Sequence, residues 1–312
     1  MKRFAGILTP IVTPFASDPS GVLDEAAMRA NVARWAATSL SGLVVLGSNG
    51  EAAQLDDAEA DRAIAVVRDV LPREKWLLAG TGRESTAATI AATARAAALG
   101  VDAVLVRTPS FFKSQMTSEV FVRHYTAVAD ASPVPVLLYN VSMFTGVNLG
   151  ADAVERLATH PNIVGMKESG SDIGLIAEFV ARTPDDFTVL AGSATTFVHA
   201  LAAGCDGAIL ALGAILPDEC RLLVELVAAG RLKDARAVQR RVMPLARSVG
   251  TTYGVAGLKA ALDLLGYTGG APRPPLLPAT PEAVEVIRRQ LTALGILDGG
   301  SQGDPPYVRQ GQ

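Results

Sequence analysis

The chain has 312 residues, of which 49% are hydrophobic and 19% are charged. This composition provides a sizeable core and argues against disorder over most of the length. The formal net charge of −3, the lack of a basic stripe and an aromatic content of only 5% argue against a nucleic-acid partner.

Short apolar runs rich in valine, isoleucine and leucine recur along the chain, separated by alanine-rich stretches with helical periodicity. The runs are predicted strands at Gly6–Val12, Gly42–Leu46, Trp76–Ala79, Ala103–Val106, Val134–Tyr139, Ile163–Met166, Thr188–Leu190 and Gly207–Leu210. The stretches are predicted helices at Asp24–Thr38, Asp56–Val70, Ser85–Leu99, Ser118–Ala129, Ala151–Ala158, Ile173–Ala181 and Ala194–Ala203. Strands that alternate with helices in this way indicate βαβ units and a parallel sheet.

Eight such units predict an α/β fold, a closed (β/α)8 TIM barrel. An open, doubly wound sheet is the alternative, and it usually has fewer strands. After the eighth run come consecutive predicted helices at Asp218–Ala229, Leu232–Val249, Gly257–Leu265 and Glu282–Leu294, with a proline-rich connector at Ala271–Pro278. We therefore expect a barrel (residues 1–228), a C-terminal helical extension (229–297) and a flexible tail (298–312) that is rich in glycine, glutamine and proline.

Several local signals support these boundaries and limit the kind of site. Asp56 and Glu59 have the spacing of a capping box, and Gly100 and Gly204 follow predicted helices, where glycine easily adopts a positive φ. The cysteines, Cys205 and Cys220, are too few for a disulfide framework, and the three histidines lack a metal-ligand spacing. The sequence therefore favours a protein without a metal, although a site assembled by folding remains an alternative.

Neither a membrane span nor a secretion signal is predicted. No apolar run reaches the ~20 residues that a transmembrane helix needs. The segment Met1–Pro14 lacks an apolar signal-peptide core followed by a cleavage site. We therefore expect a cytoplasmic protein with no membrane partner.

Lys167 closes the sixth predicted strand, and enzymes on this barrel place reactive groups at the C-terminal ends of strands. Strand alternation puts Ile163, Gly165 and Lys167 on one face, which we expect to point into the barrel. A lysine there is desolvated, which favours the neutral amine that attacks a carbonyl. The alternative is a lysine that extends to solvent. Lys259, on a predicted helix, is expected to lie on a solvated face.

Two further polar segments end predicted strands. Tyr139 closes the fifth, where a phenol could shuttle protons, although a tyrosine packed in the core is the alternative. The segment Gly47-Ser-Asn-Gly-Glu51 follows the second strand, and its glycines suit a tight turn whose amide groups could bind a carboxylate. The Ser48 hydroxyl in this turn could pass a proton. The pattern alone is weak, because glycine-rich βα loops are common.

Taken together, these segments resemble the dihydrodipicolinate synthase / N-acetylneuraminate lyase family of pyruvate-dependent class I aldolases. The resemblance extends from Phe4 to Leu297 and is carried by Gly47-Ser-Asn-Gly-Glu, Tyr139-Asn, Gly165-Met-Lys-Glu-Ser and Leu190-Ala-Gly-Ser. Within the family the chain looks most like 4-hydroxy-2-oxoglutarate aldolase. That likeness is carried by Gly47-Ser-Asn-Gly-Glu, Leu78-Ala-Gly-Thr-Gly-Arg-Glu-Ser-Thr, His160-Pro-Asn-Ile-Val-Gly-Met-Lys and Leu265-Gly-Tyr-Thr-Gly-Gly.

The resemblance implies a role for each of these positions. It implies that Lys167 forms the Schiff base, that Tyr139 donates and accepts protons, and that Ser48 relays them. It also implies that Ser48 and Asn49 bind the pyruvate carboxylate, while Gly192 and Ile209 line the pyruvate pocket with backbone groups. A homotetramer built from dimers, with no metal or organic cofactor, is implied as well.

The chain departs from the family pattern at two places. The loop after the fourth strand often has a tyrosine that reaches a neighbouring subunit's site, but here it has Phe111 and Phe112, which cannot relay a proton. Dihydrodipicolinate synthases have an arginine shortly after the strand-five tyrosine that holds the second substrate's carboxylate. Here Phe144 lies near that position, and an apolar ring cannot pair with a carboxylate.

The sequence therefore predicts a Schiff-base lyase that cleaves a 4-hydroxy-2-oxo acid, such as 4-hydroxy-2-oxoglutarate, to pyruvate and an aldehyde. Within the fold, the alternatives are a 4-hydroxy-tetrahydrodipicolinate synthase and a 2-keto-3-deoxy sugar acid aldolase or dehydratase. Outside enzymes, the alternative is a ligand-sensing barrel. The complete set of Lys167, Tyr139 and Ser48 argues against a sensor, which has no chemical reason to retain it.

Overall fold

The computed structural model describes residues 4–16 and 21–297, and its strands form one closed parallel barrel in chain order. The strands are β1 (Gly6–Pro10), β2 (Gly42–Val45), β3 (Trp76–Gly80), β4 (Ala103–Arg107), β5 (Val136–Asn140), β6 (Ile163–Glu168), β7 (Thr188–Ala191) and β8 (Gly207–Ile209). β1 pairs with β8 as well as with β2, which closes the sheet. The predicted TIM barrel is confirmed, and each strand lies within about two residues of its expected position.

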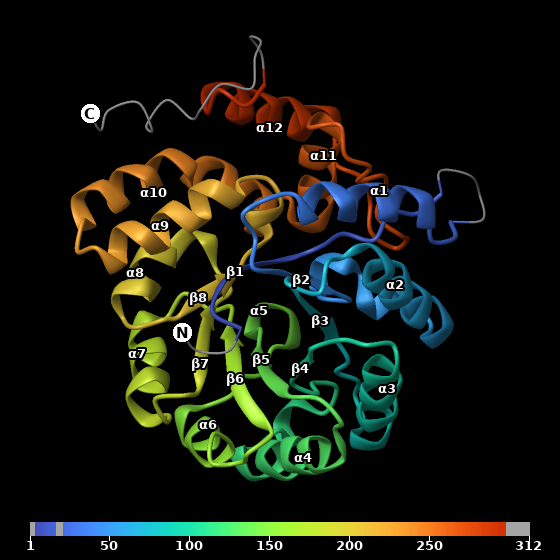
Figure 1. The fold of residues 1–312 in the computed structure, drawn as a ribbon, viewed down its shortest axis with the longest axis vertical. Coiled ribbons are helices and arrows are strands. Elements are labelled where there is room, and N and C mark those ends of the chain that lie inside the picture. The colour runs from blue at the N-terminus through green and yellow to red at the C-terminus, as the bar shows by residue number, and fades with distance from the viewer. Residues whose placement is uncertain (1–3, 17–20, 298–312) are drawn as a thin grey trace.

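Helices surround the strands, as Figure 1 shows. They are α1 (Glu25–Ala36), α2 (Asp57–Val70), α3 (Thr86–Ala98), α4 (Ser118–Ala131), α5 (Ser142–Thr145), α6 (Ala151–Leu157), α7 (Ile173–Arg182), α8 (Phe197–Ala202) and α9 (Pro217–Ala228). The predicted helices are present, but the single turn α5 was not expected, because four residues are too few to show a helical period. The capping box is confirmed, since Asp56 accepts a hydrogen bond from the Glu59 amide, and Glu59 in turn accepts one from the Asp56 amide.

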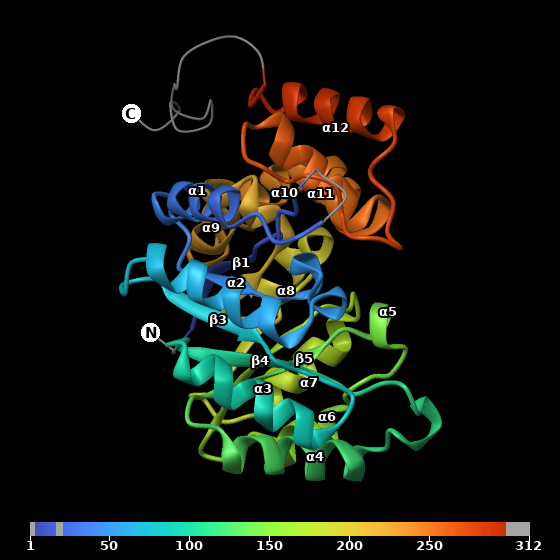
Figure 2. The ribbon, with the colours of Figure 1, turned by 90° about the vertical axis from the view of Figure 1, so that its right-hand side faces the viewer.

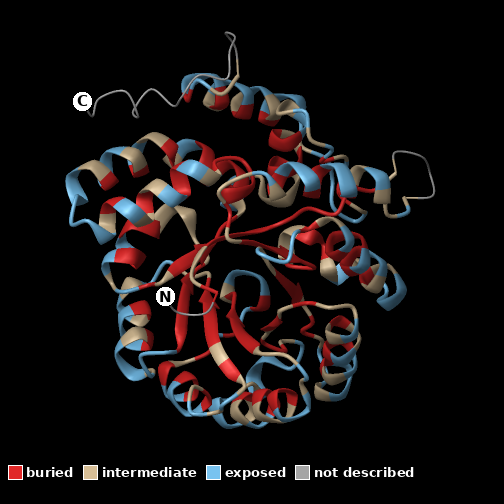
Figure 3. Cartoon of the chain, in the orientation of Figure 1, coloured by how far each residue is buried: buried red, intermediate tan, exposed pale blue. Residues whose placement is uncertain are grey.

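The core has two layers, which follow from the alternation of side chains along each strand. One layer fills the barrel and includes Leu8, Val44, Leu78, Leu137 and Ile209, all fully buried. The other lies between the strands and the helices. In Figure 3 the strands are almost entirely buried, and the exposed residues lie on the outer faces of the helices and in the loops. The strands therefore form a rigid base for the loops that follow them.

The alternation in β6 differs from the prediction. Ile163 packs in the outer layer, whereas Val164 packs against the residues inside the barrel. The register between β5 and β6 shifts at this point, because Leu137 pairs with Gly165 although Val136 pairs with Ile163. The expectation that Ile163, Gly165 and Lys167 share one face was therefore wrong for Ile163. One extra residue at a β-bulge reverses the alternation.

The C-terminal helices pack at one end of the molecule, where α12 is the outermost helix in Figures 1 and 2. They are α10 (Leu232–Arg247), α11 (Gly254–Leu264) and α12 (Pro281–Ala293). The predicted helix Leu232–Val249 corresponds to α10, which ends at Arg247 and is followed by a π-helical turn, Ser248–Thr252. The predicted tail, 298–312, lies outside the described residues, and the domain boundary at residue 228 remains a prediction. Among the described helices, none has the length and apolar character to span a membrane.

Candidate active site

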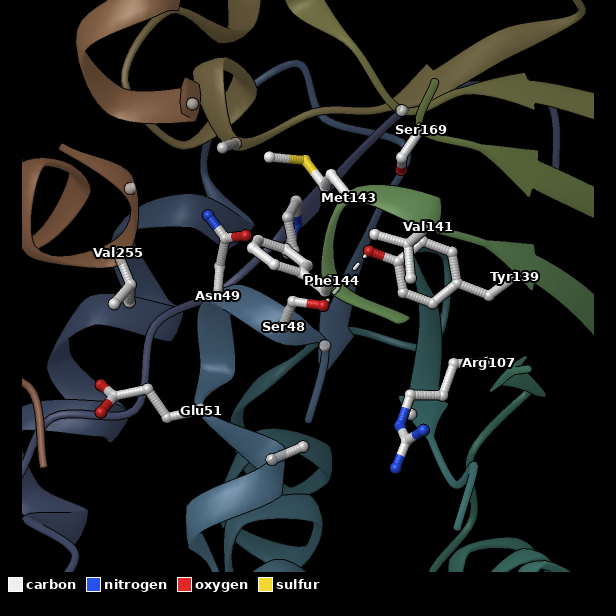
Figure 4. A pocket seen from close by; sticks show the side chains of 18 of the residues that line it. Ser48, Asn49, Glu51, Arg107, Tyr139, Val141, Met143, Phe144, Ser169 and Val255 are labelled. Carbon is white, nitrogen blue, oxygen red and sulfur yellow. Dashed lines mark hydrogen bonds between the residues drawn. The ribbon is translucent and has the colours of Figure 1, made fainter. Parts of the chain in front are cut away.

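A cavity of ≈ 710 Å³ opens at the C-terminal ends of the barrel strands. All six residues predicted to form the site line it, and they come from segments far apart in the chain: Ser48, Asn49, Tyr139, Lys167, Gly192 and Ile209. Figure 4 shows many of the side chains that surround this space. The location agrees with the general rule that reactive groups on this fold lie in the loops after the strands.

Lys167, Tyr139 and Ser48 form a chain of polar atoms in the cavity. The Lys167 ammonium donates a hydrogen bond of 3.4 Å to the Tyr139 hydroxyl, and it lies 4.4 Å from the centre of the Tyr139 ring. The Tyr139 and Ser48 hydroxyls are 3.3 Å apart, as the dashed line in Figure 4 marks. Lys167 and Tyr139 are each only 5% exposed. A proton can therefore move between these three groups with small adjustments of the side chains.

The barrel register brings the lysine and the tyrosine together. Tyr139 in β5 pairs directly with Lys167 in β6, and both side chains point into the barrel. Neighbouring parallel strands hold such paired side chains on one face. Their proximity is thus fixed by the sheet, although they are 28 residues apart in the chain.

Gly192 follows β7 and leaves room for the lysine. A Cβ atom at this position would lie 2.9 Å from Cε of Lys167 and would collide with the Ser169 hydroxyl. Its amide donates a hydrogen bond of 2.6 Å to the Glu168 carbonyl, which fixes the turn beside the lysine. Ile209, in β8, is fully buried at the same cavity.

The turn that carries Ser48 and Asn49 is a single 3-10 turn, Ser48–Gly50. Its left-handed residues are Leu46 (φ 57°) and Glu51 (φ 55°), so the positive φ values lie on either side of the turn and not at its glycines. Gly50 suits the turn for a different reason, since a Cβ there would make a tight contact of 3.1 Å with the Ile11 carbonyl. The turn is further tied to the barrel by Thr13, whose hydroxyl donates to the Gly50 carbonyl at 2.7 Å.

Lys259 is not on a solvated face, and that prediction was wrong. Its ammonium lies 2.6 Å from Oε1 of Glu51, and both side chains are 1% exposed. It also donates to the Ala271 carbonyl at 2.9 Å and lies 4.6 Å from the centre of the Phe15 ring. The reason is that Glu51, Phe15 and the connector residue Ala271 cover the face of α11 that carries Lys259. Burial lowers the pKa of Lys259, and Glu51 opposes this effect.

Arg107, at the end of β4, also lines the cavity and is paired with Glu84. The two side chains are 2.8 Å apart, and the amides of Ser110 and Phe111 each donate to the same Glu84 carboxylate at 2.8 Å. Burial alone would raise the pKa of Glu84, but these amides and Arg107 together lower it. Glu84 is therefore ionised at neutral pH and offsets the charge of Arg107.

The positions where the chain departs from the family pattern lie at the surface. Phe144, in α5, is 63% exposed and lines the cavity. Phe111 and Phe112 are 78% and 63% exposed, and their rings meet edge to face with centroids 5.1 Å apart. Neither lines the cavity of its own chain.

The other groups that could carry chemistry are occupied or scattered. Within the described part of the chain, no three His, Cys, Asp or Glu side chains are grouped closely enough to hold a metal ion. Cys205 and Cys220 are buried, and burial raises the pKa of both thiols, so neither is a ready nucleophile. Burial also raises the pKa of Glu168, although a hydrogen bond from Asn140 at 2.6 Å opposes the shift.

Comparison with known proteins gives a consistent result. The profile of the dihydrodipicolinate synthetase family matches residues 3–294. A 4-hydroxy-tetrahydrodipicolinate synthase from Exiguobacterium sp. AT1b is 36% identical over 282 residues, which is 90% of this chain and 95% of that protein. Another from Stenotrophomonas maltophilia is 37% identical over 274 residues, covering 88% and 91%. The crystal structure of dihydrodipicolinate synthase from Thermotoga maritima superimposes with a TM-score of 0.89 at 30% identity, covering 94% and 99%.

Proposed function

The chain belongs to the dihydrodipicolinate synthetase family, and on that premise we propose that it is a class I carbon–carbon lyase that forms a Schiff base between Lys167 and pyruvate. The observation that carries the proposal is the buried chain of Lys167, Tyr139 and Ser48, with hydrogen-bond distances of 3.4 and 3.3 Å. A nucleophilic amine beside a hydroxyl relay is what carbonyl addition requires.

In the proposed reaction the Lys167 amine attacks the keto carbon of the substrate. Tyr139 donates a proton to the developing carbinolamine oxygen, which then leaves as water. The resulting imine accepts the electron pair of the carbon–carbon bond that breaks, or supplies it through the enamine when a bond forms. Because the imine itself stores these electrons, the reaction needs no metal or organic cofactor.

The carboxylate of pyruvate is proposed to bind at the Ser48 turn. Ser48 and Asn49 line the cavity next to Tyr139, and Gly192 and Ile209 bound the same space. The Ser48 hydroxyl would then both contact the carboxylate and complete the proton relay. Gly192 allows the keto group to approach Lys167, because no side chain at this position fills the space.

For the second half of the reaction, we propose cleavage of a 4-hydroxy-2-oxo acid to pyruvate and an aldehyde. The support comes from the part of the cavity lining where a second substrate would bind. Phe144 and Val141 in this lining are apolar and provide no cation for an additional carboxylate. The likeness to 4-hydroxy-2-oxoglutarate aldolase has no counterpart in the names of the relatives. That acid also carries a second carboxylate, which would lack a cation beside Phe144 and Val141, so the lining favours other 4-hydroxy-2-oxo acids.

The second candidate is 4-hydroxy-tetrahydrodipicolinate synthase, and the names of the relatives favour it. This reaction condenses pyruvate with aspartate semialdehyde, whose carboxylate needs a cationic partner in a partly dry pocket. Arg107 is the cation available near the mouth of the cavity, but Glu84 already pairs with it. The ratio of kcat/KM for condensation and for cleavage, measured on one preparation, distinguishes the two candidates.

The Schiff base is tested by reduction with borohydride in the presence of pyruvate. We expect the protein to gain the mass of one reduced pyruvyl group, and peptide mapping should place it on Lys167. Lys167→Ala should abolish the adduct, whereas Lys233→Ala, at the exposed start of α10, is the matched control and should retain it. An adduct on another lysine, or none at all, would contradict the class I mechanism.

The assembly is proposed to be a homotetramer built from dimers. Its support is the family resemblance together with the exposed pair Phe111 and Phe112, which lies in the loop that reaches a neighbouring subunit in related proteins. Light scattering of the purified protein gives the mass directly. A monomer or a dimer at micromolar concentration would contradict this assembly.

A further inference from the structure

Half of the large apolar side chains that the described residues leave exposed line the cavity. Eight such side chains are exposed: Val22, Phe111, Phe112, Met143, Phe144, Leu232, Leu276 and Leu277. Four of these line the cavity, namely Met143, Phe144, Leu276 and Leu277, with exposed fractions of 56%, 63%, 41% and 80%. Exposed apolar side chains that line a pocket are typical of a binding surface.

The four side chains come from two segments that are far apart in the chain and border the same cavity. Met143 and Phe144 lie on α5, directly after β5 and its catalytic candidate Tyr139. Leu276 and Leu277 lie on the connector between α11 and α12. Figure 4 shows Val255 of α11 among the side chains around the same space. The space beyond Lys167 is therefore bordered by apolar groups from both the barrel and the helical extension.

The charged residues that line the cavity provide no free cation for a second carboxylate of the substrate. Within the lining that the structure describes, the charged residues are Glu51, Glu84, Arg107 and Lys167. Glu51 is paired with Lys259, and Arg107 with Glu84. Figure 4 shows the Arg107 guanidinium pointing away from Val141, Met143 and Phe144. A carboxylate placed against these three side chains would lose water without gaining a cation, which disfavours binding.

We propose that this apolar half of the cavity binds the hydrocarbon substituent of an aromatic aldehyde, or of the 4-hydroxy-2-oxo acid that yields it, with Phe144 as the specificity-determining residue. The inference rests on the proposed function and specifies its second substrate. An aromatic ring suits the site because it can pack edge to face or offset on the Phe144 ring, and the thioether of Met143 also packs well against aromatic rings.

Cleavage of such an acid needs only Lys167, Tyr139 and water. In cleavage, the bond between C3 and C4 of the imine breaks, and its electron pair forms the enamine. The proton of the C4 hydroxyl passes to Tyr139, and the aromatic aldehyde leaves. The enamine carbon then takes up a proton, and water hydrolyses the imine, which frees Lys167 and pyruvate. Condensation is the same path in reverse, and neither direction needs an oxidant or a reductant.

The test compares aldehydes that differ in the group this space must bind. Pyruvate is supplied with benzaldehyde, with glyoxylate or with aspartate semialdehyde, and kcat/KM is measured for each condensation. In the cleavage direction the matched pair is 4-hydroxy-2-oxo-4-phenylbutanoate and 4-hydroxy-2-oxoglutarate. We expect the aromatic member to be favoured by about 10²-fold in each direction. Equal values, or a preference for the carboxylates, would overturn the inference.

Two substitutions make the assignment to Phe144 specific. Phe144→Arg should lower kcat/KM for benzaldehyde by roughly 10-fold or more and raise it for glyoxylate by a similar factor, because a free guanidinium can then pair with the carboxylate. Phe144→Ala should lower the value for benzaldehyde without raising the value for glyoxylate. Leu232→Ala, which removes an exposed apolar side chain away from the cavity, is the control and should leave the ratio unchanged.

Borohydride trapping with pyruvate alone separates failure of this inference from failure of the proposed function. If Lys167 is labelled in the parent and in both Phe144 variants but the aldehyde ratio does not move, the Schiff-base function holds and the apolar subsite is wrong. If Lys167 is never labelled, the function itself fails. Light scattering measures whether the Phe144 substitutions change the mass of the assembly. A Phe144→Ala protein with changed mass and an unchanged ratio would show that Phe144 contacts a second copy of the chain, which would also overturn the inference.

Discussion

The ammonium of Lys259 lies 2.6 Å from a carboxylate oxygen of Glu51, and neither side chain is more than 1% exposed. Glu51 directly follows the turn that carries Ser48, whereas Lys259 belongs to α11 of the helical extension. The other oxygen of Glu51 accepts a hydrogen bond of 2.7 Å from the Arg273 amide in the connector. The extension is thereby attached to a turn that forms one wall of the cavity. In Figure 4 the Glu51 carboxylate points away from Ser48 and Tyr139, which places the pair behind the reacting groups.

We predict that Lys259→Met lowers the free energy of unfolding by roughly 3–5 kcal/mol, because it leaves the Glu51 charge buried and unpaired. The variant that also carries Glu51→Gln removes that charge while the side-chain oxygen can still accept from Arg273, so it should recover part of the loss. Urea unfolding of the parent, both single variants and the double variant gives the coupling between the two positions.

The exposed pair Arg221 and Glu225 provides the control for this cycle. An ion pair on a helix surface contributes about 0.3–0.5 kcal/mol, so Arg221→Ala should be nearly neutral. If Lys259→Met were equally mild, or if the double variant were no more stable than Lys259→Met, the buried pair would not be holding the turn.

Tyr139→Phe should reduce kcat by roughly 10²–10⁴-fold, the usual effect of losing a positioned acid/base group. Tyr139 is the group that links Lys167 to Ser48, through hydrogen bonds of 3.4 and 3.3 Å. Pyruvate should still bind, since its proposed anchors are Ser48 and Asn49, and equilibrium binding checks this separately from turnover. Near-normal turnover would mean that Tyr139 only packs inside the barrel.

Stability should depend on the protonation of His124, which lies in α4 and is 5% exposed. Its Nδ1 lies 2.9 Å from the Thr86 hydroxyl, and within the described residues its Nε2 is buried without a hydrogen-bond partner. Burial lowers the pKa of His124 from 6.5 to about 4, and the nearby charge of Glu84 only partly opposes this. The folded state therefore disfavours protonation of His124. In the unfolded chain the imidazole is exposed to water and binds a proton more readily.

Because the unfolded state binds this proton first, stability is unaffected above about pH 6.5 and falls as the pH decreases toward about 4. Between pH 6.5 and 5 the loss from this residue should be about 2 kcal/mol, at 1.36 kcal/mol per pH unit. Other groups titrate in the same range, so the quantity to compare is the slope for the parent against that for His124→Gln. Identical slopes would show that His124 keeps its ordinary pKa in the folded state.

The barrel could be predicted because its strands are buried on both faces and therefore appear as short, continuous apolar runs. The position of Lys167 could be predicted for a related reason, since it is the polar residue that ends such a run. The bulge at Val164 could not, because a shift in register depends on the neighbouring strand and leaves no local signal. The predicted inward direction of Lys167 is unaffected, because the bulge lies before Gly165 and normal alternation continues from Gly165 to Lys167.

The buried role of Lys259 could not be predicted from its helix. Its partner Glu51 is more than 200 residues earlier in the chain, and nothing in the local pattern shows which helix face the connector will cover. One signal was available, because the helical neighbours of Lys259 include the apolar residues Val255, Ala256 and Leu262. Of the exposed apolar side chains that line the cavity, Phe144 could be predicted from the sequence. Leu276 and Leu277 could not, because the path of the connector that carries them is set by tertiary packing.

Gly192→Ala should impair Schiff-base formation more than it impairs folding. The added methyl group would lie 2.9 Å from Cε of Lys167 and would collide with the Ser169 hydroxyl, so the lysine must move away from its position beside Tyr139. A displacement of about 1 Å at a reacting group can cost on the order of 10² in rate. We therefore expect the rate of borohydride trapping with pyruvate, and kcat with it, to fall by about that factor. Gly150→Ala is the matched control, because a methyl group there meets no atom within 4 Å. If both variants trapped pyruvate at the parent rate, the space at Gly192 would not be needed by Lys167, and the proposed pyruvate pocket would have to lie elsewhere in the cavity.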